Sequence, residues 1–277
     1  MSIHLSPQQI EQYHTEGYLL IPEVFSRAEL IAMREKLLQS FENELWQQAP
    51  YSDATIINDL FSFFPEIVDT LFNEKYIGII KALTNNDAVW IPECSVHRNR
   101  YIHWHKDTSI QELHGEHSHN NGYTPLIQSA IYFQDNNAET GGGLTVIQGS
   151  HLMKDGYYNM FSHSLINRVY YKILKLLQLS PFDKMERSPN KVDIPGKIGD
   201  LLVFDVRLDH RATLANGKTK DDKLAVFNTF GQKNNVTKRY FEFMKQRPEP
   251  YYQYFNEYPL PYCVYQKAKE LSIEVWY

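Results

Sequence analysis

Three side chains that can bind a metal ion stand at alternate positions in the segment HWHKD. His103, His105 and Asp107 would project from one side of this segment if it is an extended strand, because alternate residues of a strand face the same way. A further pair, Asp209 and His210, follows the strongly apolar segment GDLLVFD. A histidine and a carboxylate close in sequence, with one distant histidine, fit the two-histidine-one-carboxylate facial triad. That triad holds Fe(II) and leaves positions open for substrate and oxygen.

These residue types leave two questions open. Zinc uses the same ligands together with a bound water, so the ligands alone do not identify the metal. Either His103 or His105 could be the first ligand. A cupin-type arrangement, in which HxH is followed closely by Glu, fits poorly because the next carboxylate, Glu112, lies too far along the chain. The histidine-rich segment at 114–121 could also bind metal, although a solvated loop beside the site is the simpler interpretation.

The composition is that of a globular protein. The chain has 277 residues, of which 43% are hydrophobic and 22% charged, and this suits one sizeable domain or two small ones. A net charge of −5 argues against a nucleic-acid partner. The two cysteines, Cys94 and Cys263, form neither a disulfide framework nor a CxxC zinc pattern, which favours a reduced, cytoplasmic setting. We expect no membrane association, because the chain has no secretory signal pattern and no apolar stretch long enough to span a bilayer.

Helical signals dominate the first third of the chain. Ser6 is a candidate N-cap followed by Pro7, and Gly17 is a helix stop. A second capping pair, Ser26 and Glu29, opens an amphipathic segment. The sequence thus predicts helices over 7–16, 27–46 and 64–84, and a short buried strand over 18–22.

From about residue 88, β-branched and aromatic residues predominate and turn signals recur. Strands are expected within 88–105, 124–135, 141–151, 199–205 and 223–231, a helix over 163–178, a loop over 180–198, and a tail over 248–262 before a short C-terminal helix. This order predicts one mainly β domain with helical additions, a sandwich, barrel or jelly roll. Its expected parts are a helical N-terminal part (about 1–85), a β core (about 86–235) and a C-terminal extension (about 236–277).

Three segments, taken in order, resemble the signature blocks of the phytanoyl-CoA dioxygenase family. They are WHKD (104–107), TGGGLTVIQGSH (140–151) and GDLLVFDVRLDHR (199–211). The opening segment GYLLIPEVFSRAEL (17–30) is also similar, so the resemblance covers about 6–231. It implies a double-stranded β-helix (jelly roll, cupin-like) core flanked by N-terminal helices. It also implies the cofactors Fe(II) and 2-oxoglutarate, with O2 as co-substrate.

The family motif Trp-His-x-Asp implies metal ligands at His105 and Asp107, with His210 as the distal ligand. His103 remains the alternative to His105. The residues expected to contact substrate are His103, Trp104 and Lys106. Related halogenases have a small residue in place of the carboxylate, so the presence of Asp107 favours oxygen transfer or another oxidation over halogenation.

The position that would hold 2-oxoglutarate departs from the family pattern. The family binds the far carboxylate of 2-oxoglutarate with an arginine after the distal histidine, because a guanidinium pairs with a carboxylate through two parallel hydrogen bonds. Here Arg211 adjoins the ligand and would point to the opposite face. Lys223 begins the next apolar strand, so we expect it to be the anchor, with Lys218 and Lys220 as alternatives. Thr213, one residue beyond the family's usual hydroxyl position, is expected to contribute a co-substrate contact.

The expected function is therefore an Fe(II)/2-oxoglutarate-dependent dioxygenase of the hydroxylase type. Its substrate would be a small-molecule metabolite or natural-product intermediate. One alternative is a non-catalytic relative that binds a small ligand in the same pocket. Another is a metal-dependent oxygenase that does not use 2-oxoglutarate. Desaturation, epoxidation and ring formation are equally compatible with the triad.

Overall fold

The computed structural model describes 5–49, 52–113, 124–153, 183–217, 221–246 and 260–276, together with residues 169, 172, 173 and 176. The histidine-rich segment at 114–121 lies outside the described residues. The same holds for most of the helix expected at 163–178 and of the tail expected at 248–262.

The first two helices begin and end where their capping residues predict. α1 (Pro7–Glu16) starts after Ser6, whose side chain accepts a hydrogen bond from the Gln9 amide while the Gln9 side chain accepts one from the Ser6 amide. It stops at Gly17, whose φ of 84° is the left-handed conformation that glycine adopts without strain. α2 (Arg27–Glu42) starts after Ser26 and ends four residues before the predicted Trp46, which lies in the short 3-10 helix Leu45–Gln47.

The single helix predicted over 64–84 is divided into short pieces. The 3-10 turn Pro65–Ile67 leads into α4 (Val68–Leu71), and α5 (Glu74–Leu83) follows. The division occurs because the Asn73 side chain accepts a hydrogen bond from the Tyr76 amide and so starts a new helix. α3 (Leu60–Phe63) precedes these elements.

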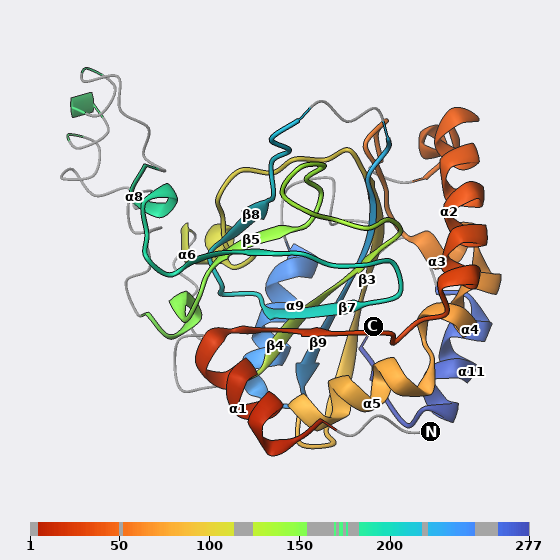
Figure 1. Cartoon of the computed structure of the whole chain (residues 1–277). Coiled ribbons are helices and arrows are strands. Elements are labelled where there is room, and N and C mark those ends of the chain that lie inside the picture. The colour runs from red at the N-terminus through yellow and green to blue at the C-terminus, as the bar shows by residue number, and fades with distance from the viewer. Residues whose placement is uncertain are drawn as a thin grey trace.

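A seven-stranded major sheet forms the centre of the molecule (Figure 1). Its order is β1 (Tyr18–Ile21), β7 (Leu201–Asp205), β4 (Leu126–Tyr132), β9 (Leu224–Gln232), β3 (Ala88–Arg98) and β10 (Glu274–Val275), with β2 (Ile56–Ile57) also paired to β3. All pairs are antiparallel except β10 with β3. The largest hydrophobic cluster lies on one face of this sheet, where buried side chains of α1, α2, α3, α4, α5 and α11 (Tyr262–Glu270) cover it.

A three-stranded minor sheet faces the other side of the major sheet. It consists of β6 (Lys191–Ile194), β5 (Leu144–Ile147) and β8 (His210–Ala212), and an antiparallel bridge between His105 and His210 extends it. A second hydrophobic cluster, which includes Val146, Phe204 and Ala225, fills the space between the sheets. Two facing antiparallel sheets with this connectivity confirm the predicted jelly-roll core. β6 lies where the sequence was interpreted as a loop.

Short helices complete the described chain. α6 (Ser109–Leu113) and α8 (Asp183–Glu186) lie beside the minor sheet, and α9 (Asn235–Gln246) follows β9 (Figure 1). None of the described helices has the length and apolar character needed to cross a bilayer.

Candidate metal centre

His105, Asp107 and His210 form a group of potential metal ligands at the edge of the minor sheet. One ligand atom from each residue lies within 4.8 Å of the others. Asp107 Oδ1 is 3.7 Å from His105 Nε2 and 3.8 Å from His210 Nε2, and the two imidazole centroids are 4.1 Å apart. The three donors therefore face one common space. His103, the alternative ligand, is exposed and does not belong to this group.

Backbone hydrogen bonds hold the two ligand segments in register. His105 and His210 exchange two backbone hydrogen bonds of 2.9 Å each, and the Asp107 amide donates to the Val206 carbonyl at 2.9 Å. Pairing with the minor sheet therefore sets the positions of His105 and His210. Asp107 lies in the turn that follows, which its amide hydrogen bond ties to Val206.

Each imidazole is oriented by its other nitrogen. His105 Nδ1 lies 2.7 Å from the His103 carbonyl oxygen, and His210 Nδ1 lies 2.9 Å from the Leu208 carbonyl oxygen. A carbonyl oxygen only accepts, so each Nδ1 carries the proton and each Nε2 presents a lone pair. Metal-bound histidines in proteins are commonly fixed in this way.

Burial keeps both imidazoles neutral. It lowers the pKa of His105 to about 4, with the neighbouring His210 acting in the same direction, and lowers the pKa of His210 to about 4. A neutral imidazole and an ionised carboxylate are the forms that bind a metal ion. The donor set, the tautomers and the protonation states therefore fit a two-histidine-one-carboxylate iron site.

The chain sequence matches the phytanoyl-CoA dioxygenase (PhyH) family over residues 13–218. This match spans most of the chain and includes all three members of the triad. The chain belongs to the phytanoyl-CoA dioxygenase family. Its members are iron-dependent oxygenases that use 2-oxoglutarate and O2. No curated protein shows significant sequence similarity to the chain.

Solved structures with the same fold include several enzymes of small-molecule biosynthesis. The α-ketoglutarate-dependent carbocyclase SnoK from nogalamycin biosynthesis is 18% identical, with a TM-score of 0.57 over 83% of this chain and 85% of that one. HygX from Streptomyces hygroscopicus with iron bound is 16% identical, with a TM-score of 0.58 over 83% and 88% of the two chains. EctD from S. alaskensis with bound Fe is 15% identical, with a TM-score of 0.56 over 82% and 77%. At these identities the likeness shows the fold alone.

Lys223, the expected co-substrate anchor, lies just beyond the end of the family match. It directly precedes β9, in phase with Ala225 and Phe227, whose side chains face the space between the sheets. A Cβ atom on Gly142 would lie 2.9 Å from Lys223 Cδ, so the lysine stem runs closely over that glycine. Lys223 is 7% exposed, and burial lowers its pKa. Among the described residues no hydrogen bond or ion pair satisfies its ammonium group.

Thr213, the expected second co-substrate contact, faces the other way. Its hydroxyl lies 3.0 Å from that of Thr145, which donates to Asp193 at 2.6 Å. This orientation does not support the expected co-substrate contact of Thr213, which stays a prediction. Residues of β8 alternate, so His210 and Ala212 face the space between the sheets while Arg211 and Thr213 face outward.

Trp104 and Lys106, both expected to contact substrate, are also on the outer face of the minor sheet. Trp104 is 2% exposed and donates to Glu186 at 2.8 Å. Lys106 is also buried; burial raises the pKa of Asp209 to about 7, and the charge of Lys106 opposes that rise. The alternation that brings His105 and Asp107 together turns these two residues away from the metal face. Neither side chain is placed to touch a substrate there.

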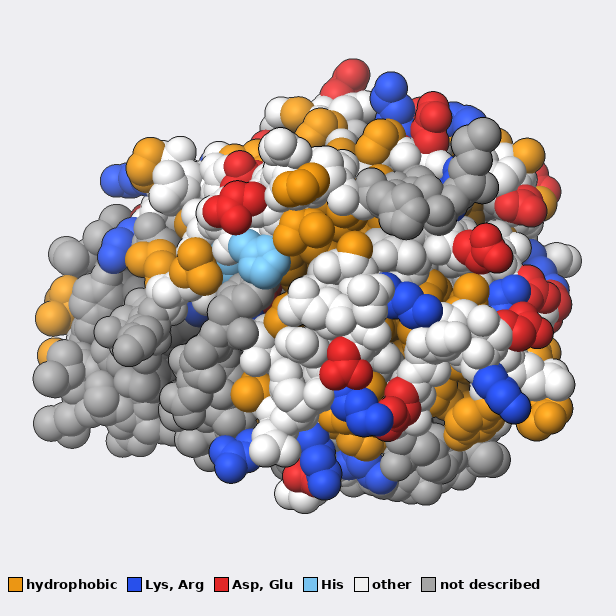
Figure 2. Space-filling model, turned by 90° about the horizontal axis from the view of Figure 1, so that it is seen from below, with side chains coloured by type: hydrophobic (Ala, Val, Ile, Leu, Met, Phe, Trp, Pro, Cys, Tyr) orange, Lys and Arg blue, Asp and Glu red, His pale blue; other side chains and the backbone are white. Residues whose placement is uncertain are grey.

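The residues that precede His105 in the chain are apolar as well as polar. His103 is exposed, and Tyr101 and Ile102 beside it are each 39% exposed. Figure 2 shows one face of the molecule on which histidine side chains lie next to hydrophobic ones.

His97 and Ser95 are inward-facing polar residues that the sequence interpretation did not single out. Both lie on β3, opposite Ala225 and Phe227 of β9, and the His97 ring is 4.7 Å from the Phe227 ring. Ser95 Oγ and His97 Nε2 are 3.2 Å apart. Burial, together with the charge of Arg100, lowers the pKa of His97 to about 3. In the segment SVH, Ser95 and His97 are polar residues at alternate positions of a strand, and this pattern could have indicated that both face the same side.

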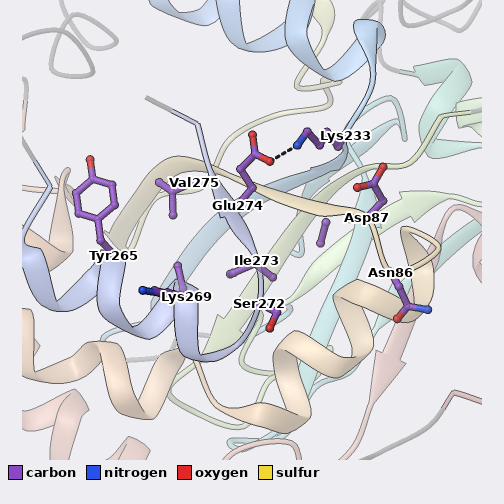
Figure 3. Close-up of a pocket in the computed structure, with 11 residues that line it drawn as sticks. Asn86, Asp87, Lys233, Tyr265, Lys269, Ser272, Ile273, Glu274 and Val275 are labelled. Atoms are coloured by element: carbon purple, nitrogen blue, oxygen red, sulfur yellow. Dashed lines mark hydrogen bonds and ion pairs between the residues drawn. The ribbon is translucent and has the colours of Figure 1, made fainter.

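An open cavity of about 450 Å³ lies elsewhere, at the opposite end of β9 from Lys223 (Figure 3). It is lined by residues of α11 and β10 and by Lys233, which forms an ion pair with Glu274. This cavity is separate from the candidate metal centre.

Proposed function

We propose that the chain is an Fe(II)- and 2-oxoglutarate-dependent oxygenase with His105, Asp107 and His210 as its metal ligands. The observation that carries this proposal is the convergence of two neutral Nε2 atoms and one carboxylate on a common space. With Fe(II) and 2-oxoglutarate bound, such a site activates O2 to oxidise a substrate. The residues of the chain supply orientation, and the cofactors supply the chemistry.

Lys223 is the proposed anchor of the far carboxylate of 2-oxoglutarate. Burial lowers the pKa of the Lys223 ammonium, and the charges of Asp221 and Asp135 oppose this only in part. An anionic ligand would compensate for the remaining cost of burying the charge. Lys223 faces the same space between the sheets as His210, because both side chains lie on inward-facing positions. Lysine provides a point charge where the family has a guanidinium fork, so a less directional contact is expected.

The proposed substrate is a small-molecule metabolite or natural-product intermediate that undergoes hydroxylation or a related oxidation. Two of the solved structures support this class. SnoK is a carbocyclase of nogalamycin biosynthesis, and a HygX structure contains nickel, 2-oxoglutarate and hygromycin B. The exposed Tyr101, which lies in phase with His103 and His105 along the chain, suits a substrate with an apolar part.

An anaerobic titration tests the proposal. Metal-free protein is given Fe(II) and then 2-oxoglutarate while the visible spectrum is recorded. We expect a charge-transfer band that requires both additions, is absent in His105→Ala and persists in His103→Ala. A band lost in His103→Ala and kept in His105→Ala would show that the ligand assignment is wrong.

The same titration separates the alternative functions. Iron binding without the band would indicate an oxygenase that does not use 2-oxoglutarate. No iron binding would indicate a non-catalytic ligand-binding relative. Succinate formation from 2-oxoglutarate, measured with and without O2, then establishes turnover.

A further inference from the structure

Glu186 connects the two strands that carry the histidine ligands. Its Oε1 accepts a hydrogen bond from Trp104 Nε1 at 2.8 Å and lies 2.9 Å from Arg211 Nε. Trp104 directly precedes His105, and Arg211 directly follows His210. One carboxylate therefore contacts the chain neighbours of both imidazole ligands.

Further contacts fix this arrangement on the outer face of the minor sheet. The Arg211 guanidinium carbon lies 5.3 Å from the centre of the Trp104 ring, a cation–π distance. Lys191 Nζ, at the start of β6, is 3.1 Å from Glu186 Oε2. Glu186 thus contacts side chains from three separate segments in or beside the minor sheet.

α8, the helix that carries Glu186, also packs against the minor sheet through an apolar contact. Met185, the residue before Glu186 in α8, is buried in a small cluster with Trp104 and Ile147. α8 is consequently held by this apolar contact and by the hydrogen bond and ion pairs of Glu186, and Trp104 takes part in both the apolar contact and the hydrogen bond.

We propose that Glu186 is a positioning residue for the metal centre. It fixes Trp104 and Arg211, and through their backbones it sets the separation of His105 and His210. Groups that orient metal ligands without touching the metal typically change metal affinity ~10- to 100-fold when they are removed. This inference rests on the proposed metal-binding function.

The test measures metal affinity and geometry, not turnover. Co(II) is titrated into the metal-free full-length protein, and its visible absorption reports both the dissociation constant and the coordination. For Glu186→Ala we expect a dissociation constant roughly 10- to 100-fold higher and a changed spectrum. Glu186→Gln keeps an oxygen acceptor for Trp104 but loses the charge that Arg211 and Lys191 contact, so an intermediate loss is expected.

A matched control lies on the same outer face. Asp193 of β6 accepts a hydrogen bond from Thr145 and, within the described part of the chain, has no hydrogen bond or ion pair with Trp104 or Arg211. Asp193→Ala should therefore bind Co(II) as the wild type does. A purely structural role for Glu186 would lower the melting temperature of the metal-free variant while leaving its Co(II) affinity and spectrum unchanged. That result would overturn the inference.

A double-mutant cycle checks the route through Trp104. Trp104→Phe removes the indole donor and keeps the aromatic ring. If Glu186 acts partly through this hydrogen bond, the double variant loses less affinity than the sum of the two single losses. Fully additive losses would contradict the mechanism. Failure of the wild type to bind Co(II) would refute the proposed function itself, whereas normal wild-type binding with an unaffected Glu186→Ala would refute this inference alone.

Discussion

Replacement of Lys223 by methionine tests the co-substrate site most directly. Methionine keeps most of the length of the stem that runs over Gly142 and removes only the charge. Truncating one partner of a buried charge pair costs about 2–5 kcal/mol. The charges of Asp221 and Asp135 already offset part of the burial of Lys223, so the lower part of that range applies. It corresponds to about 2–3 kcal/mol, or roughly a 30- to 150-fold weaker affinity for 2-oxoglutarate.

The assay is the titration of Fe(II)-loaded, oxygen-free protein with 2-oxoglutarate, followed by steady-state succinate formation. The KM for 2-oxoglutarate should rise with the dissociation constant, while kcat at saturation changes much less, because the anchor binds co-substrate equally before and during reaction. Lys223→Arg, which restores the family's residue type, should retain or improve affinity. Lys233→Met is the matched control, since Lys233 pairs with Glu274 at the far end of β9.

A dissociation constant for Lys223→Met within twofold of the wild-type value would refute the assignment of the anchor. Lys218→Met and Lys220→Met then become decisive, because these two lysines were the alternatives in the sequence. A large loss of affinity in either variant, with Lys223→Met unaffected, would assign the anchor to that lysine instead.

Three further predictions concern other parts of the molecule. Asp107→Ala should lower Fe(II) affinity and abolish succinate formation, measured by metal titration and product assay; retained turnover would exclude Asp107 as a ligand. Gly142→Ala should raise the KM for 2-oxoglutarate about tenfold without altering metal affinity, because the new methyl group would lie 2.9 Å from Lys223 Cδ and the residue has a φ of 87°. Burial raises the pKa of Asp59 to about 6, and its Oδ2 has no hydrogen-bond partner among the described residues. The stability from its neutral form is therefore fully present below about pH 4 and lost as the pH rises through about 6. Chemical denaturation of metal-free protein should show wild type losing about 2–3 kcal/mol relative to Asp59→Asn between pH 4 and pH 7; a pH-independent difference would contradict this.

Local sequence signals predicted the elements that depend on local interactions. The Ser6 cap and the Gly17 stop placed α1 correctly, because a cap needs only neighbouring residues. The sequence did not predict β6. Its outward-facing residues, Lys191 and Asp193, are charged and a proline follows directly, so the segment has the composition of a loop. Its strand conformation depends on pairing with β5, which is distant in sequence.

The metal-ligating residue types were evident from sequence, but the surroundings were only partly so. Alternation along the chain brings His105 and Asp107 to one side. The same rule, applied to Trp104 and Thr213, would have placed both on the opposite side. No sequence pattern indicated that Glu186 lies near the metal centre. Its position depends on the docking of a one-turn helix, which no periodicity in the sequence indicates.

β1 and β10 are the two outermost strands in the order of the major sheet, and this has a practical consequence. The two ends of the chain each cap one edge, β1 against β7 and β10 against β3. Trimming the chain past Ile21 or before Glu274 would uncover a row of unpaired amide and carbonyl groups on the neighbouring strand, which is a template for association with other molecules. Shortened versions of this protein are therefore expected to be limited by aggregation before they are limited by iron loading, and both tails belong in any version prepared for crystallisation.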